Sequence, residues 1–150
     1  MVNEEQEKWK KLIKSAAFFR SFGDEELDEL ITYVVLKKYR EDEFIVKEKT
    51  KGESFFILLK GKALIQKMNE LSVPLRVAAL KSGDCFGEMS IVLNQPRSAS
   101  IVASEPCFVI EVELHKIDTM PAKIQLKLYR QFSINLAKRL QGGSSSPEPS

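Results

Sequence analysis

Histidine is almost absent from this chain of 150 residues, because His115 is the only one. Ser-His-Asp triads and Cys-His dyads need a histidine beside a nucleophile, and histidine-rich metal sites need several. His115 lies in the helix-like stretch ELHKIDTM, where a lone histidine is typical of a solvated surface position. No other set of residues suggests catalysis. We therefore expect a protein that is not an enzyme and has no catalytic residue, metal or cofactor.

Cysteine, long apolar runs and excess charge of one sign are also scarce. Cys85 and Cys107 lie in strand-like segments without metal-ligand spacing, which favours a reduced, cytoplasmic compartment. The N-terminal stretch MVNEEQEKWKKLIKSAAFF is charged from its start and does not resemble a signal peptide. No apolar run is long enough to predict a membrane span. The net charge of +2 is too small to indicate nucleic acid or an anionic membrane as the main partner.

Helical periodicity marks both ends of the chain. Residues 4–34 contain apolar side chains at helical spacing in two stretches, and Ser21 or Asp24 is expected to cap the second helix. Helical patterns return over residues 113–141. The low-complexity end GGSSSPEPS, residues 142–150, predicts a disordered tail.

The segment between these helices, residues 35–112, is built from short β-branched or aromatic runs. Turn signals such as KTKGE, KGK and KSGD separate the runs, and the spacing is nearly even. Such a pattern indicates an antiparallel sandwich or jelly-roll barrel. We therefore predict an α+β fold over residues 1–141, in which an antiparallel β-roll is flanked by N-terminal and C-terminal helices. The runs are VVLKKY, EFIVKE, SFFILLK, ALIQKM, LRVAAL, SASIVA and CFVIEV.

One stretch inside the β-rich region, FGEMSIVLNQPRSASIVA at residues 86–103, is too long for a tight turn. Its MSIVLNQ segment can form a short helical turn after Gly-Glu, whose free N–H groups at Met89 and Ser90 would bind an anion. Arg97 suits a phosphate, and Glu88 suits a neighbouring hydroxyl. A sugar phosphate supplies both groups. The alternative is that Glu88 and Arg97 only form a salt bridge across the loop.

The stretch FGEMSIVLNQPRSAS resembles the phosphate-binding cassette of the cyclic-nucleotide-binding domain family, which includes regulatory subunits of protein kinase A, cyclic-nucleotide-gated channels and catabolite activator proteins. Two further segments are similar to that family. KTKGESFFILLKGKALI resembles its paired-glycine strand segment, with Gly52 and Gly61 in place, and LKSGDCFGE resembles the strand that leads into the cassette, with Gly83. The resemblance covers roughly residues 10–140 and implies a short cassette helix and C-terminal lid helices.

The resemblance implies a role for each residue of the cassette. Glu88 would accept a hydrogen bond from the ribose 2′-hydroxyl, and Arg97 would pair with an exocyclic oxygen of the cyclic phosphate. Backbone amides at Met89 and Ser90 would complete the phosphate site. Gly87 would let the backbone approach the sugar.

The residues after the arginine are small, and their roles have two interpretations. The hydroxyl or amide of Ser98 would contact the phosphate or a guanine in the syn form, so the residue is compatible with cAMP and with cGMP. Alternatively Ser98 is small only to leave space. Ala99 lets the ligand come close to the backbone and is expected to pack more than to contact it.

The C-terminal helix also has two interpretations. In the family this helix closes over the base, and Tyr129 and Phe132 are the candidates for contact with the purine. Alternatively their rings only pack the helix onto the roll or onto a second subunit.

These observations predict a stand-alone sensor of cAMP or cGMP whose helices change position when the ligand binds. Its output would be a protein effector or self-association through the terminal helices. Direct DNA binding is not expected, because no helix-turn-helix follows the lid helix. One alternative is a degenerate member of the family that acts as an interaction module without ligand, and another is a sensor of a cyclic dinucleotide. A metalloenzyme with a similar β-roll would need several histidines.

Overall fold

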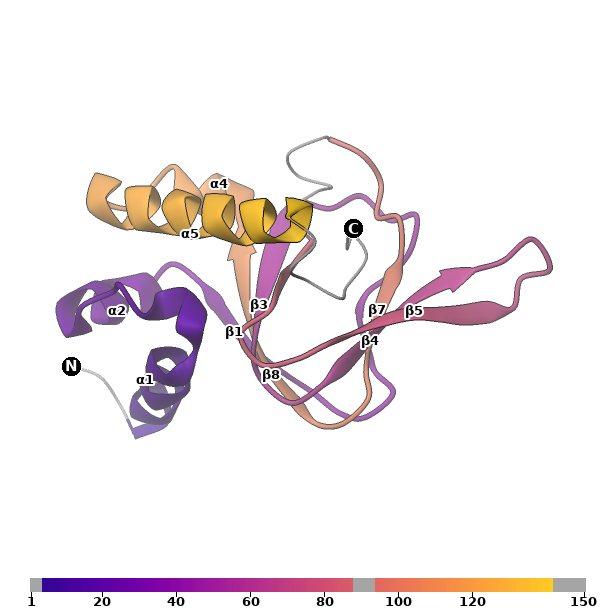
Figure 1. Ribbon diagram of the computed structural model, residues 1–150. Coiled ribbons are helices and arrows are strands. Elements are labelled where there is room, and N and C mark those ends of the chain that lie inside the picture. The colour runs from indigo at the N-terminus through magenta and orange to yellow at the C-terminus, as the bar shows by residue number, and fades with distance from the viewer. Residues whose placement is uncertain (1–3, 88–93, 142–150) are drawn as a thin grey trace.

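The computed structural model describes residues 4–87 and 94–141. The predicted site residues Glu88, Met89 and Ser90, the predicted short cassette helix and the predicted disordered tail at 142–150 lie outside the described residues. In the described segments, helices cover one side of an antiparallel β-roll, as Figure 1 shows. The predicted α+β class and the antiparallel β-roll are therefore confirmed.

The chain begins with a helical unit of three short elements: α1 (Glu4–Ser15), the 3-10 turn η1 (Ala17–Phe19) and α2 (Asp24–Ile31). The expected cap of the second helix is wrong, because Asp24 is already helical and Gly23 occupies the N-cap position. The side chain of Glu26 reaches back and accepts a hydrogen bond from the Gly23 N–H at 2.8 Å. Glu26 thus binds one N–H at this helix start without a capping hydroxyl.

Strands of the described segments pair into two four-stranded sheets, in which every pairing is antiparallel. Sheet A has the order β1-β8-β3-β6, and sheet B has the order β2-β7-β4-β5. In chain order the strands are β1 (Val35–Tyr39), β2 (Phe44–Val46), β3 (Ser54–Lys60), β4 (Ala63–Met68), β5 (Pro74–Leu80), β6 (Cys85–Phe86), β7 (Ser100–Ala103) and β8 (Cys107–Glu113).

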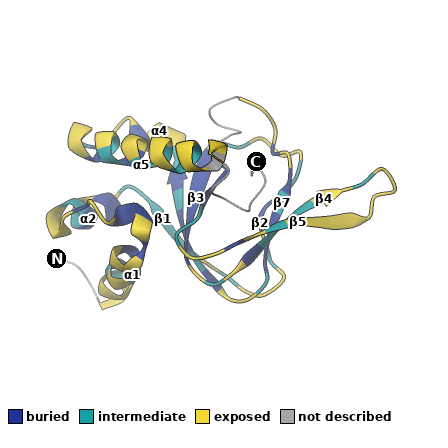
Figure 2. Ribbon diagram, in the orientation of Figure 1, coloured by how far each residue is buried: buried dark blue, intermediate teal, exposed yellow. Residues whose placement is uncertain are grey.

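The hydrophobic core is divided by sheet A into two clusters. Successive residues of a strand point to opposite faces, so Phe55 packs against the helices whereas Phe56 faces the interior of the roll. Figure 2 shows β3 of this sheet in the buried colour, whereas the edge strand β1 is mostly intermediate. The β4–β5 hairpin instead extends away from the body of the molecule and is largely exposed (Figures 1 and 2).

The C-terminal part consists of a single turn, α4 (Leu114–Ile117), and a long helix, α5 (Ala122–Leu140). Ile124 and Leu128 of α5 are buried in the same cluster as the N-terminal helices. Within the described residues, no helix is both long and apolar enough to cross a membrane.

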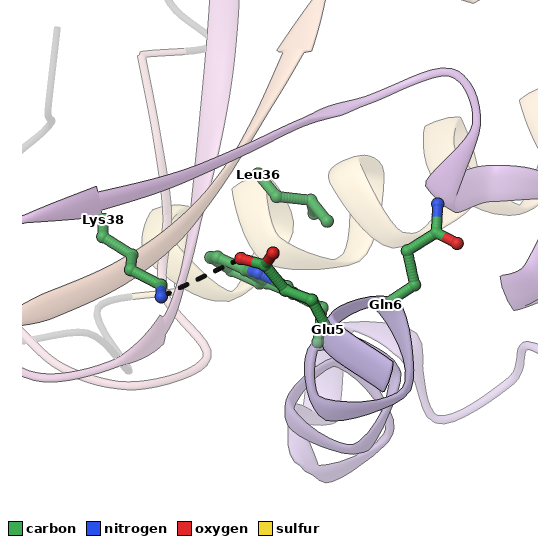
Figure 3. A pocket seen from close by; sticks show the side chains of 5 residues that line it. Glu5, Gln6, Leu36 and Lys38 are labelled. Atoms are coloured by element: carbon green, nitrogen blue, oxygen red, sulfur yellow. Dashed lines mark ion pairs between the residues drawn. The ribbon is translucent and has the colours of Figure 1, made fainter. Parts of the chain in front are cut away.

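A groove of about 390 Å³ lies between α1 and the edge strand β1. Figure 3 shows Glu5 of α1 and Lys38 of β1 facing each other across it, with 4.0 Å between carboxylate and ammonium. Both side chains are mostly exposed, so this pair contributes little to the docking of α1.

Candidate ligand-binding site around Arg97

Arg97 is the one charged side chain among the described residues that is buried, with 5% of its surface exposed. Its Nη1 donates a hydrogen bond to the carbonyl of Gly87, and its Nη2 donates one to the carbonyl of Ser54, each at 2.6 Å. Burial of a guanidinium is costly unless its N–H groups are hydrogen-bonded. These two carbonyls therefore offset part of that cost and fix where the guanidinium points.

Gly87 shows why a glycine stands near the start of the cassette. Its φ of +88° lies in the region that side chains with a Cβ rarely adopt. A Cβ built at this position would lie 2.7 Å from Nη1 of Arg97. Within the described residues, the glycine therefore makes room for the arginine that its own carbonyl binds.

The backbone around Arg97 is held by the segment that precedes β3. The Arg97 N–H donates to the carbonyl of Thr50 at 2.8 Å, and the Arg97 carbonyl accepts from the Lys49 N–H at 2.7 Å. Lys51 and Pro96 form an isolated antiparallel bridge beside them. This short ladder sets the position from which the arginine side chain enters the roll.

A pocket of about 550 Å³ reaches Arg97 from the side of the Ser54 carbonyl. Of the predicted site residues that the structure describes, Arg97 alone lines it. The remaining lining residues come from β2, the segment before β3, β3, the end of β8 and α4: Phe44, Ile45, Val46, Lys47, Thr50, Lys51, Glu53, Ser54, Phe56, Glu111, Glu113 and His115.

The carboxylates of this pocket are partly neutralised by nearby lysines. Lys37 of β1 donates to Glu111 at 2.6 Å, and this hydrogen bond raises the pKa of Lys37. Lys51 lies 3.8 Å from Glu53, although both side chains are exposed. Such compensation lowers the repulsion that an anion bound near Arg97 would meet.

The small residues after the arginine separate into two environments. Ser98 is exposed, whereas Ala99 is fully buried among the residues that fill the roll interior. A ligand contact of Ala99 stays a prediction. The exposed Ser98 hydroxyl lies next to Arg97 in the chain, and its contact with a ligand remains a prediction.

The two aromatic candidates on α5 do not lie with Arg97 in this structure. The Phe132 ring packs against Phe55 of β3, with 4.0 Å between ring centroids, and edge-on against Phe18 at 6.2 Å. Tyr129 is 45% exposed. Because Phe55 faces the helices, both rings lie on the opposite face of sheet A from the arginine, and their contact with a base stays a prediction.

Two residues of the site, Ser54 and Phe56, are absent from the set predicted from sequence. They occupy alternate positions of β3 in the stretch ESFFILLK. Strand periodicity places both on one face, but only the tertiary structure brings that face to Arg97.

Comparison with known proteins identifies the same region. The sequence model of the family described as "Cyclic nucleotide-binding domain" matches residues 36–123. The chain is 27% identical over 138 residues to the cGMP-dependent protein kinase of Eimeria tenella, and this alignment covers 92% of this chain and 13% of the kinase. It is 29% identical over 111 residues to the human cGMP-dependent protein kinase 2, covering 71% of this chain and 15% of the kinase.

Solved structures share the fold. A cyclic nucleotide-binding domain from Methylobacillus flagellatus has a TM-score of 0.75 at 24% identity, covering 91% of this chain and 78% of that one. The regulatory domain of Toxoplasma gondii PKA with cAMP has a TM-score of 0.65 at 22% identity, covering 85% and 49%. The catabolite activator protein of Thermus thermophilus has a TM-score of 0.71 at 23% identity, covering 84% and 59%.

These matches define the family but not a whole protein's activity. The chain spans 13% and 15% of the two kinases, so their catalytic activity does not transfer to it. The family match nonetheless covers more than half of the chain and includes the β-roll, apart from the first residue of β1, together with Arg97. The chain therefore belongs to the cyclic nucleotide-binding domain family.

Proposed function

We propose that this domain binds cAMP or cGMP and that Arg97 receives the cyclic phosphate. The observation that supports this most is the buried guanidinium whose direction is set by the carbonyls of Gly87 and Ser54. A guanidinium is planar and permanently charged, so it suits bidentate contact with phosphate oxygens. Gly87, Glu88, Met89, Ser90, Ser98 and Ala99 would surround the sugar phosphate.

The base of the bound nucleotide is either adenine, as in cAMP, or guanine, as in cGMP. The kinases similar to this chain are named as cGMP-dependent, whereas the Toxoplasma regulatory domain is named with cAMP. The exposed Ser98 hydroxyl suits either ligand, because it can contact a phosphate oxygen or a guanine edge.

Ligand binding is proposed to move the terminal helices and so to signal to a protein partner or to promote self-association. Exposed Leu126, Ile134 and Leu140 on α5 support such a contact, since apolar side chains on one helix suit another protein surface. The buried thiols of Cys85 and Cys107 agree with a reduced, cytoplasmic environment. Action without a second attached domain stays a prediction.

Calorimetric titration of the purified protein with cAMP and then cGMP tests the proposal, after absorbance has shown that no nucleotide co-purifies. We expect saturable binding at one site with a preference for one base. Arg97→Ala removes the charged partner of the phosphate and should weaken binding by roughly 2–5 kcal/mol, about 30-fold or more in Kd.

Circular dichroism of Arg97→Ala confirms that the variant is folded before its affinity is compared. Unchanged affinity in that variant would show that the phosphate does not bind at Arg97. A folded, ligand-free wild-type protein that binds neither nucleotide would instead favour the interaction module without ligand.

A further inference from the structure

Strand β3 contacts the arginine at two alternate positions. The Ser54 carbonyl accepts the Nη2 hydrogen bond at 2.6 Å, and the Phe56 ring lies under the guanidinium with 5.7 Å between Cζ of Arg97 and the ring centroid. A guanidinium over an aromatic face within about 6 Å is attracted by the ring quadrupole. One strand therefore supplies both a hydrogen-bond acceptor and an aromatic face to the same side chain.

The Phe56 ring adds an orienting contact to the hydrogen bonds of the guanidinium. Bonds from Nη1 to Gly87 and from Nη2 to Ser54 fix two points at one end of the group. The face of Phe56 opposes a tilt of the guanidinium, because a tilted group would lose contact with the ring on one side.

The Phe56 ring is itself held in place. It is 5% exposed and stacks on Phe86 of β6, with 5.2 Å between centroids and 13° between the planes. A Cβ at Gly87 would lie 3.3 Å from the Phe56 ring as well as 2.7 Å from Nη1 of Arg97. Ring, arginine and glycine turn thus form one close-packed unit.

We propose that Phe56 is a positioning residue for the ligand: it fixes the plane of the Arg97 guanidinium and thereby raises the affinity for the cyclic phosphate. The inference about affinity rests on the function proposed above, whereas the inference about the plane concerns Arg97 alone. A guanidinium oriented in advance loses less conformational entropy when it binds phosphate.

The test compares Phe56→Leu with Phe86→Leu. Each variant removes one ring of the same stacked pair, but only Phe56→Leu removes the ring under Arg97. We expect Phe56→Leu to bind the preferred cyclic nucleotide about fivefold to thirtyfold more weakly than Phe86→Leu, the range that a partly desolvated cation–π contact corresponds to. Phe56→Tyr, which keeps the aromatic face, should retain most of the affinity.

Nitrogen-15 NMR of the Arg97 side chain supplies a measurement that needs no nucleotide. Loss of the ring current in Phe56→Leu should shift the Arg97 Nε–Hε resonance, whereas Phe86→Leu and Phe56→Tyr should leave it near its wild-type position. If the wild-type protein binds no nucleotide, the proposed function fails but this shift still decides whether Phe56 positions the arginine.

Equal affinity losses in Phe56→Leu and Phe86→Leu, together with an unmoved Arg97 resonance, would overturn the inference. If Phe56→Leu does not fold, Phe56→Met takes its place, since methionine fills a similar volume without an aromatic face. The same comparison with Phe56→Tyr and Phe86→Leu then applies.

Discussion

Two glycines in this domain share a left-handed backbone but differ in their surroundings. Gly87 has a φ of +88° and Gly83 has a φ of +94°. A Cβ at Gly87 would meet Nη1 of Arg97 at 2.7 Å, whereas a Cβ at Gly83 would meet nothing within 4 Å. The backbone alone explains the glycine at 83, and both backbone and arginine explain the glycine at 87.

Gly87→Ala and Gly83→Ala therefore separate backbone strain from a steric clash. Gly83→Ala should lower the free energy of unfolding by about 1–2 kcal/mol, the usual cost of a left-handed residue with a Cβ. Gly87→Ala should lower it further and should also weaken nucleotide binding, because Arg97 has to move. Urea denaturation and calorimetric titration measure the two effects. Equal losses of stability with unchanged affinity would contradict this explanation.

At the scale of elements, the N-terminal helices are joined to α5 by Lys127. Its ammonium donates to Glu26 at 2.6 Å and to the carbonyl of Ser21 at 2.7 Å, and it lies 5.7 Å from the centre of the Phe22 ring. Glu26 also accepts from the Gly23 N–H. One lysine thus binds the start of α2, the preceding turn and an aromatic ring.

Lys127→Met should destabilise the docking of α5 more than Lys123→Met. Lys123 is one turn earlier on α5, is mostly exposed and lies 3.8 Å from Glu26, which makes it a matched control. Lys127→Met leaves the Ser21 carbonyl and Glu26 with a lost partner. Hydrogen exchange of α2 and α5 amides should become faster in Lys127→Met and change little in Lys123→Met. Similar exchange in both variants would assign the docking to apolar packing alone.

The lowered pKa of Glu26 predicts how the stability of the fold changes with pH. The hydrogen bond from the Gly23 N–H, followed by that from Lys127, lowers the pKa of Glu26 below its ordinary value of 4.5. A carboxyl whose pKa is lower in the folded state stabilises the fold above 4.5, and this contribution is lost as the pH falls below it. Thermal unfolding of Glu26→Gln from pH 7 to pH 3 should show a weaker dependence on pH than wild type. An unchanged profile would exclude Glu26 as a contributor.

In the molecule as a whole, β3 lies between α5 and the arginine. Phe55 contacts Phe132 of α5 on one face, and Phe56 contacts Arg97 on the other. A shift of either residue moves the same backbone, so the two clusters of the core are mechanically connected through adjacent residues. This arrangement supports the proposed transmission from phosphate to helix.

Saturating cyclic nucleotide should accordingly change the backbone amide spectrum of α5 as well as that of the roll. A ligand shifts such an equilibrium only through its higher affinity for one conformation. Two-dimensional amide spectra with and without ligand measure the change, and Leu71 at the tip of the exposed β4–β5 hairpin serves as an internal control expected to move little. Changes restricted to the roll would show that the ligand binds without any transmission to α5.

Much of this architecture was predictable because strand and helix periodicities are local properties. The alternation in SFFILLK and the helical spacing near Leu128 each follow from which side chains must leave water. Gly87 and Arg97 were also predictable, since the cassette motif keeps them at a recognisable spacing in one stretch of chain. The cap of α2 was not, because Ser21, Asp24 and Glu26 all carry acceptor oxygens near the helix start, and the fold selects Glu26 for the Gly23 N–H.

Local patterns and motifs in the sequence are enough to assign an α+β domain with a β-roll, to place it in a cyclic-nucleotide-binding family and to select Arg97 as the central candidate. What holds that arginine is visible only in the folded chain. Ser54 and Phe56 are 43 and 41 positions away from it in the chain, and the packing of the two sheets brings them into contact. The tertiary structure also places Phe132 against Phe55 on the opposite face of the sheet. The physical reason is that local periodicity selects the buried face of each element, whereas contacts between faces depend on how all the elements pack together.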